Sequence, residues 1–148
     1  MQDIKQLLPH REPFLFVDRI EKFDDEEVIG YRRFTDKDFF FKGHFPDYPV
    51  VPGVILVETM AQCGGAGIRL AGKVDPNALF FLASVDKVKL RQQVRPGDEV
   101  KMVKEPTGQP ENTEAERPGL RGRPAGRGGG VVLSVWYALG SAGSAIPY

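Results

Sequence analysis

The chain has 148 residues, of which 41% are hydrophobic and 27% charged, and its 20 basic residues balance 20 acidic ones. This length predicts one globular domain with a real core, and the even charge balance argues against a general nucleic-acid binder. One cysteine and two histidines cannot form a disulfide or the four-ligand Cys/His set of a structural zinc site, so we expect neither metal nor cofactor.

The N-terminal part predicts a short helix followed by a hairpin. Asp3–Leu8 is typical of one helical turn that two prolines end. Phe14–Phe23 and the alternating segment Val28–Arg33 flank an acidic turn, which predicts two antiparallel strands. The N-terminus lacks the unbroken apolar stretch of a secretion signal, and no later segment is typical of a membrane span. We therefore expect a cytoplasmic protein.

The clearest helix follows an irregular loop, Phe34–Gly53, that is rich in Phe, Pro and Gly. The helix begins at Pro52, because proline suits a first helical position, and ends near Gly72. Its apolar residues point to nearly every side, which predicts burial all round. Three glycines at positions 64, 65 and 67 weaken it by up to about 1 kcal/mol each. We therefore expect a sheet that wraps closely around this helix.

The second half predicts two strands, Ala78–Leu90 and Glu99–Val103, separated by a turn signal. The composition changes after Lys104. Residues 105–130 are rich in Gly, Pro and Arg and hold almost no large apolar residue, a composition that ordinarily indicates disorder. Beyond them, Val131–Leu139 has the pattern of a buried strand.

Two polar residues stand out in apolar surroundings, His44 in the loop and Glu58 in the middle of the helix. A lone loop histidine is more often a surface or satisfied core residue than a catalyst, whereas a buried glutamate is seldom retained without a partner or a role. Gln62 lies four residues after Glu58 on the same face, so its amide can donate to the carboxyl. Gly53 offers a backbone N–H at the helix start that suits an oxyanion. Such groups are what proton abstraction next to a carbonyl requires.

Three segments of the chain closely resemble the 3-hydroxyacyl-acyl-carrier-protein dehydratases of bacterial fatty acid synthesis: LLPHREPFLFVDRI, GHFPDYPVVPGVILVETMAQ and DKVKLRQQVRPGD. The resemblance covers Ile4 to about Lys104. In relatives that also isomerise the double bond, the acidic helix residue is typically Asp. Glu58 therefore favours the branch that only dehydrates.

The resemblance implies an α+β hot-dog fold, in which an antiparallel sheet wraps around a central buried helix. It also implies a homodimer, commonly gathered into a trimer of dimers, with His44 from one protomer and Glu58 from the other in each active site. His44 would take the proton alpha to the thioester carbonyl, and the Gly53 N–H would stabilise the enolate. Glu58 would assist departure of the 3-hydroxyl as water. The implied substrate is a thioester of acyl carrier protein.

Further residues are expected around this site. Those predicted to contact substrate beside Gly53 are Gln62, Phe45, Tyr48 and Val54. Seven phenylalanines are expected mainly in the core, with the lining of an acyl tunnel as the alternative: Phe14, Phe39, Phe40, Phe41, Phe45, Phe80 and Phe81. Cys63 is expected to serve packing. The two-residue period places Lys87, Lys89 and Arg91 on one strand face, which is either a solvated face or a landing site for the acidic carrier protein.

The family's last strands belong after Lys104, where the resemblance stops. Read one base later, one permissible codon set for Arg117–Val131 encodes GRAYVDGQLAAEAEL, which resembles the missing hairpin. We therefore hypothesise a frameshift between Lys104 and Arg117. If the tail stands as written, Val131–Leu139 replaces a family strand and leaves an edge open to aggregation.

Two other functions remain as alternatives. One is a hot-dog thioesterase, but the GHFP motif together with Glu58 argues against it. The other is a non-catalytic module that binds acyl chains or carrier protein, which applies if the altered tail disables the enzyme.

Overall fold

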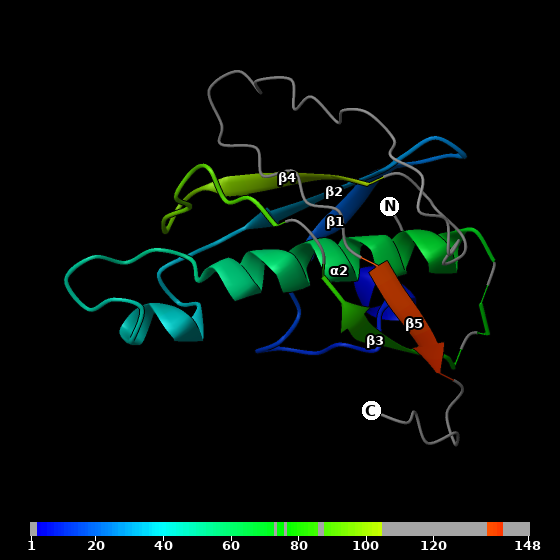
Figure 1. The fold of residues 1–148 in the computed structure, drawn as a ribbon, viewed down its shortest axis with the longest axis horizontal. Coiled ribbons are helices and arrows are strands. Elements are labelled where there is room, and N and C mark those ends of the chain that lie inside the picture. The colour runs from blue at the N-terminus through cyan, green and yellow to red at the C-terminus, as the bar shows by residue number, and fades with distance from the viewer. Residues whose placement is uncertain (1–2, 73, 76, 86–87, 105–135, 141–148) are drawn as a thin grey trace.

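The computed structural model describes residues 3–72, 74–75, 77–85, 88–104 and 136–140. Its elements in chain order are α1 (Ile4–Leu7), β1 (Arg19–Phe23), β2 (Val28–Arg33), the 3-10 helix η1 (Phe39–Lys42), α2 (Gly53–Leu70), β3 (Leu79–Ser84), β4 (Glu99–Lys104) and β5 (Trp136–Gly140). The long helix α2 lies along the sheet of β1, β2 and β4, and the pair β3–β5 lies on its other side (Figure 1).

Both groups of strands are antiparallel. β2 lies between β1 and β4, and its Gly30 faces Met102 of β4, while β3 pairs with β5. The predicted hairpin is confirmed, but β1 begins at Arg19 instead of Phe14. The reason is that the backbone of Phe14 and Phe16 is hydrogen-bonded to a side chain of α2 and not to a neighbouring strand.

The start of α2 is more open than predicted. Ile55, Leu56 and residues 59–67 are buried, but Val54 is 76% exposed and Glu58 is only partly covered. The prediction that α2 is buried on every side is therefore wrong for its first turns in a single chain. The close approach of the sheet is confirmed at Gly67, where an added Cβ would lie 2.3 Å from Cγ2 of Val28.

The core combines side chains of α2 with those of the sheet and the preceding loops. Its largest fully buried members include Phe16, Phe34, Met60 and Met102. Cys63 is also fully buried, and burial raises the pKa of its thiol to about 12, which fits the packing role expected for it.

The phenylalanines divide into two groups. Phe40 and Phe41 are buried as predicted, and Phe80 is partly buried. Four others are more than 40% exposed and their assignment to the core is wrong: Phe14, Phe39, Phe45 and Phe81. An apolar residue in the sequence indicates that something covers its side chain, and the described residues of one chain cover these four only in part.

The predicted disordered segment, residues 105–130, lies outside the described residues. So do residues 131–135 of the strand predicted at Val131–Leu139, while β5 covers Trp136–Gly140. Within the described part of the chain, no helix is both long and apolar enough to cross a bilayer.

Candidate active site

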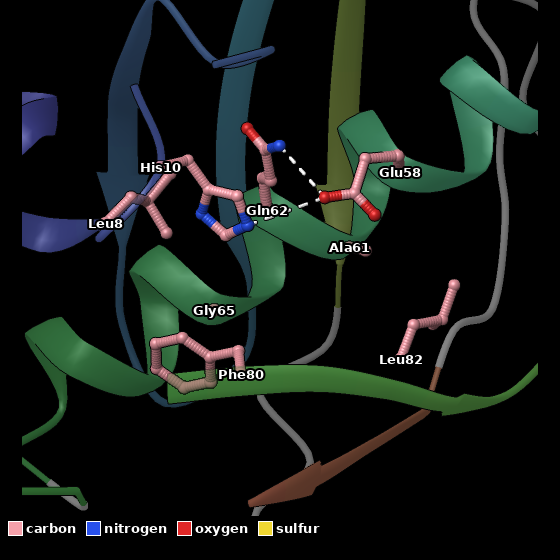
Figure 2. A pocket seen from close by; sticks show the side chains of 8 residues that line it. All are labelled: Leu8, His10, Glu58, Ala61, Gln62, Gly65, Phe80 and Leu82. Atoms are coloured by element: carbon pink, nitrogen blue, oxygen red, sulfur yellow. Dashed lines mark hydrogen bonds and ion pairs between the residues drawn. The ribbon is translucent and has the colours of Figure 1, made fainter. Parts of the chain in front are cut away.

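Glu58 lines a pocket between α2, the loop after α1 and β3 (Figure 2). The residues around it are Leu8, His10, Glu58, Ala61, Gln62, Gly65, Phe80 and Leu82. The Glu58 side chain retains 20% exposure, so its carboxyl is accessible from the pocket instead of enclosed in the core. The remaining wall is apolar except for His10 and Gln62.

Gln62 fixes the Glu58 carboxyl. Its Nε2 donates to Glu58 Oε1 at 2.9 Å, which confirms the hydrogen bond that the four-residue spacing predicted. The same Nε2 donates to the Phe14 carbonyl at 3.0 Å, and Gln62 Oε1 accepts from the Phe16 N–H at 2.7 Å. Gln62 is 2% exposed, so three hydrogen bonds and the surrounding core hold it in one orientation.

His10 is the site residue that sequence reasoning missed. Its Nε2 lies 3.5 Å from Glu58 Oε1, and its side chain is 21% exposed. Burial is the main cause that lowers the pKa of His10, Glu58 opposes this effect, and Arg11 adds to it. The only available signal was the position of His10 within the quoted segment LLPHREPFLFVDRI.

His44 lies in the loop between η1 and α2 and is partly buried. Its Nδ1 is 2.8 Å from the Val50 carbonyl oxygen, and its ring stacks on Phe45 with 4.2 Å between centroids. Because a carbonyl only accepts, Nδ1 must carry the hydrogen, and the neutral ring then presents its lone pair at Nε2. A lone pair at Nε2 is what a general base needs.

The structure does not bring His44 and Glu58 together within the described part of one chain. His44 is absent from the residues that line the Glu58 pocket, and none of its hydrogen bonds reaches Glu58. Gly53, the first residue of α2, is likewise outside that pocket. Its N–H meets no acceptor among the described residues, as expected for a helix start.

A side chain at position 53 would collide with its surroundings. An added Cβ on Gly53 would lie 2.3 Å from Cδ1 of Leu90. Two of the predicted contact residues, Val54 next to Gly53 and Phe45 next to His44, are exposed. The helix start and the His44 loop thus present apolar side chains to the exterior of a single chain.

Tyr48 is held against the loop before β4. Its hydroxyl donates to Gln93 Oε1 at 2.7 Å, and the Arg95 guanidinium lies over its ring, 4.5 Å from the centroid. Arg95 also donates to the Tyr48 hydroxyl and, at 3.2 Å, to Gln93. Tyr48 thus belongs to the same loop as His44, and it is absent from the residues that line the Glu58 pocket.

Lys89 and Arg91, two of the three basic residues predicted on a strand face, do not lie on a strand. β3 ends at Ser84, and the described residues from there to β4 include no strand. Lys89 and Arg91 are exposed in this irregular segment, while Lys87 is outside the described residues. The argument from strand period is therefore wrong, since it assumed a strand through Leu90.

Across the parts of the chain that are described, no cluster of three or more His, Cys, Asp or Glu could hold a metal ion.

Comparisons with known proteins show the family to which the chain belongs. A family model described as a FabA-like domain matches residues 8–110. The chain belongs to this family. Among its curated relatives is a 3-hydroxyacyl-acyl-carrier-protein dehydratase FabZ of Halalkalibacterium halodurans, 39% identical over 133 residues, which are 89% of this chain and 86% of the relative. This alignment extends beyond Lys104.

Two further FabA-like relatives carry the same dehydratase name. The protein of Streptococcus equi subsp. zooepidemicus is 46% identical over 70% of this chain and 75% of its own length. That of Clostridium perfringens is 43% identical over 69% of this chain and 73% of its own length. A solved structure, the dehydratase heterocomplex ApeI:P from Xenorhabdus doucetiae, matches with a TM-score of 0.63 at 19% identity and covers 75% of each chain. The predicted α+β hot-dog fold is confirmed.

Proposed function

We propose that this FabA-like protein removes water from (3R)-3-hydroxyacyl chains on acyl carrier protein and forms the trans-2-enoyl thioester in fatty acid biosynthesis. Relatives that carry this dehydratase name match it at 39%, 43% and 46% identity. No observation favours the thioesterase or the non-catalytic binding module. The proposal includes no cofactor, because the acid and base groups supply the chemistry. It also includes a cytoplasmic location.

The observation that carries the mechanism is the fixed orientation of the His44 ring. With Nδ1–H bonded to the Val50 carbonyl, Nε2 is free to take the C2 proton of the substrate. The electrons of the C2–H bond form the C2=C3 double bond as the C3–O bond breaks. Glu58 gives its proton to the departing hydroxyl, which leaves as water. The Gly53 N–H donates to the thioester oxygen while negative charge develops there.

The site proposed is shared between two protomers of a homodimer, with His44 from one and Glu58 from the other. Support comes from the separation of the two residues within one chain. It also comes from two exposed apolar side chains, Phe45, which stacks on His44, and Val54 at the start of α2. The proposal extends to a trimer of dimers. Substrate contact is proposed for Tyr48 at the rim. Carrier-protein contact is proposed for Lys87 and for the exposed cations Lys89 and Arg91.

The test is hydration of a crotonyl thioester on acyl carrier protein, followed by loss of enoyl absorbance. We expect turnover by the wild-type chain and a loss of roughly 100- to 10,000-fold in His44→Ala and in Glu58→Gln. The matched control is Glu12→Gln, the same substitution at an exposed residue of the loop after α1, which should retain full activity. Release of free thiol would reveal a thioesterase. A folded wild-type chain without turnover, or an active His44→Ala variant, would overturn the proposal.

A further inference from the structure

The Glu58 carboxyl is approached at one oxygen by two side chains. Gln62 Nε2 lies 2.9 Å from Oε1, and His10 Nε2 lies 3.5 Å from the same atom. Figure 2 shows both contacts meeting at this oxygen while the second one, Oε2, points away from both side chains. None of the described residues forms a hydrogen bond or ion pair with Oε2. The carboxyl thus has a held oxygen and an open oxygen.

The tautomer of His10 follows from its surroundings. Oε1 of Glu58 can only accept hydrogen bonds when the carboxyl proton is on Oε2 or absent, so the ring nitrogen that faces it, Nε2, must carry the hydrogen. His10 Nδ1 is buried and has no hydrogen-bond partner among the described residues. A second proton on Nδ1 would create a buried N–H without an acceptor, which is unfavourable. The ring is therefore a neutral donor toward Glu58.

The charged groups around His10 agree with a neutral ring. Glu58 faces it from α2, and Arg11 lies next to it in the same loop, with its guanidinium bonded to the carbonyl oxygens of Leu8 at 2.9 Å and of His10 at 2.6 Å. β3 contributes only apolar pocket residues, of which Phe80 is one. Burial and Arg11 together outweigh the attraction of Glu58, so the pKa of His10 is lowered.

We propose that His10 is a positioning residue of the dehydration site: with Gln62 it holds Oε1 of Glu58 from two sides, so that Oε2 carries the proton to the leaving hydroxyl. This role rests on the proposed function, because it assigns the direction of the Glu58 proton. The 3.5 Å separation is long for a hydrogen bond. Catalytic contacts of this kind often tighten once substrate is bound.

The first test is a histidine titration by NMR, which does not depend on turnover. The chain has two histidines, so the His44→Ala variant assigns the His10 ring signal directly. We expect His10 to titrate below its ordinary value of 6.5. Glu58→Gln should lower the His10 pKa further, because it removes the negative charge that favours the imidazolium. Glu12→Gln, the matched loss of a nearby carboxylate, should leave it unchanged. An unchanged His10 titration in Glu58→Gln would overturn the pairing.

The second test compares two replacements of His10 by dehydration kinetics. His10→Phe keeps a planar ring without an N–H, whereas His10→Gln places an amide N–H near the position of Nε2. We expect His10→Phe to lower kcat roughly 10- to 100-fold with little change in KM, since a misdirected acid affects the transition state more than binding. His10→Gln should recover most of that loss at equal thermal stability.

Equal losses in both variants would indicate a merely structural role, and full activity in His10→Phe would show that no positioning is needed. If His10→Phe does not fold, the titration and the activity of His10→Gln still decide the inference: an inactive but folded His10→Gln would overturn it. An inactive wild-type enzyme would refute the proposed function itself. A normal wild-type rate with an uncoupled His10 would refute this inference alone.

Discussion

Gln62 connects the fold to the site, so replacing it should cost both stability and activity. In Gln62→Met the shape of the side chain is nearly kept, but the buried Phe16 N–H loses its acceptor at 2.7 Å and the Phe14 carbonyl loses its donor at 3.0 Å. An unsatisfied buried group costs about 1–3 kcal/mol, and the Phe14 carbonyl is closer to solvent. We expect the free energy of unfolding to fall by about 2–4 kcal/mol. Glu58 also loses its hydrogen bond at Oε1, so turnover of the remaining folded enzyme should fall as well.

The assay for Gln62→Met is urea unfolding at one fixed protein concentration, because an oligomer's apparent stability depends on concentration. The matched control is Gln92→Met, the same substitution at an exposed glutamine, which should change stability by less than about 0.5 kcal/mol. If Gln62→Met cost no more than this control, Gln62 would not be the group that satisfies the Phe14 and Phe16 backbone. The explanation for the late start of β1 would then be wrong too.

Three further predictions concern assembly, packing and the coding sequence. Dimers formed at random from inactive His44→Ala and Glu58→Gln chains should recover about one quarter of wild-type activity. Half of these dimers are mixed, and each mixed dimer has one intact site of its two. No recovery would show that both residues of an active site come from the same chain. Gly67→Ala should destabilise the protein by about 1–2 kcal/mol in thermal unfolding because its Cβ would lie 2.3 Å from β2, whereas Gly65→Ala, with 3.4 Å to its nearest neighbour, should be tolerated. Sequencing of the coding DNA should reveal a changed reading frame between Lys104 and Arg117, and a shifted frame that encodes no family-like hairpin would exclude it.

Local patterns were enough to predict the elements that local interactions determine. Apolar alternation predicted β2, and Pro52 with the apolar run after it predicted α2. The Glu58–Gln62 hydrogen bond was predictable because four residues bring two side chains to one helix face. The length of β3 was not, because a strand ends where its partner ends, and partners are set by tertiary pairing.

The rest of the site depends on contacts between distant parts of the chain. His10 and Glu58 are 48 residues apart in the sequence but in contact in the structure. A periodic pattern within one segment cannot predict a contact between a loop residue and a distant helix. Composition likewise cannot distinguish an apolar side chain in the core from one at an interface, so Phe39 and Phe45 were assigned to the core although both are exposed. Sequence reasoning therefore predicted His44 and Glu58 as the reacting groups, but it missed His10, which lies next to Glu58 in the structure.

The two halves of the proposed site differ in how completely one chain builds them. Glu58 has its partners Gln62 and His10 and a formed pocket within a single chain, so its orientation is set by folding. His44 also has a fixed tautomer, but it sits beside Phe45, which is 52% exposed, and no part of the Glu58 pocket reaches it. Association of two chains would cover that apolar surface and bring base to acid in one event. The same association of two chains would then bury the apolar surface and complete the active site. A folded but dissociated chain should therefore hold Glu58 in its orientation and yet remain inactive.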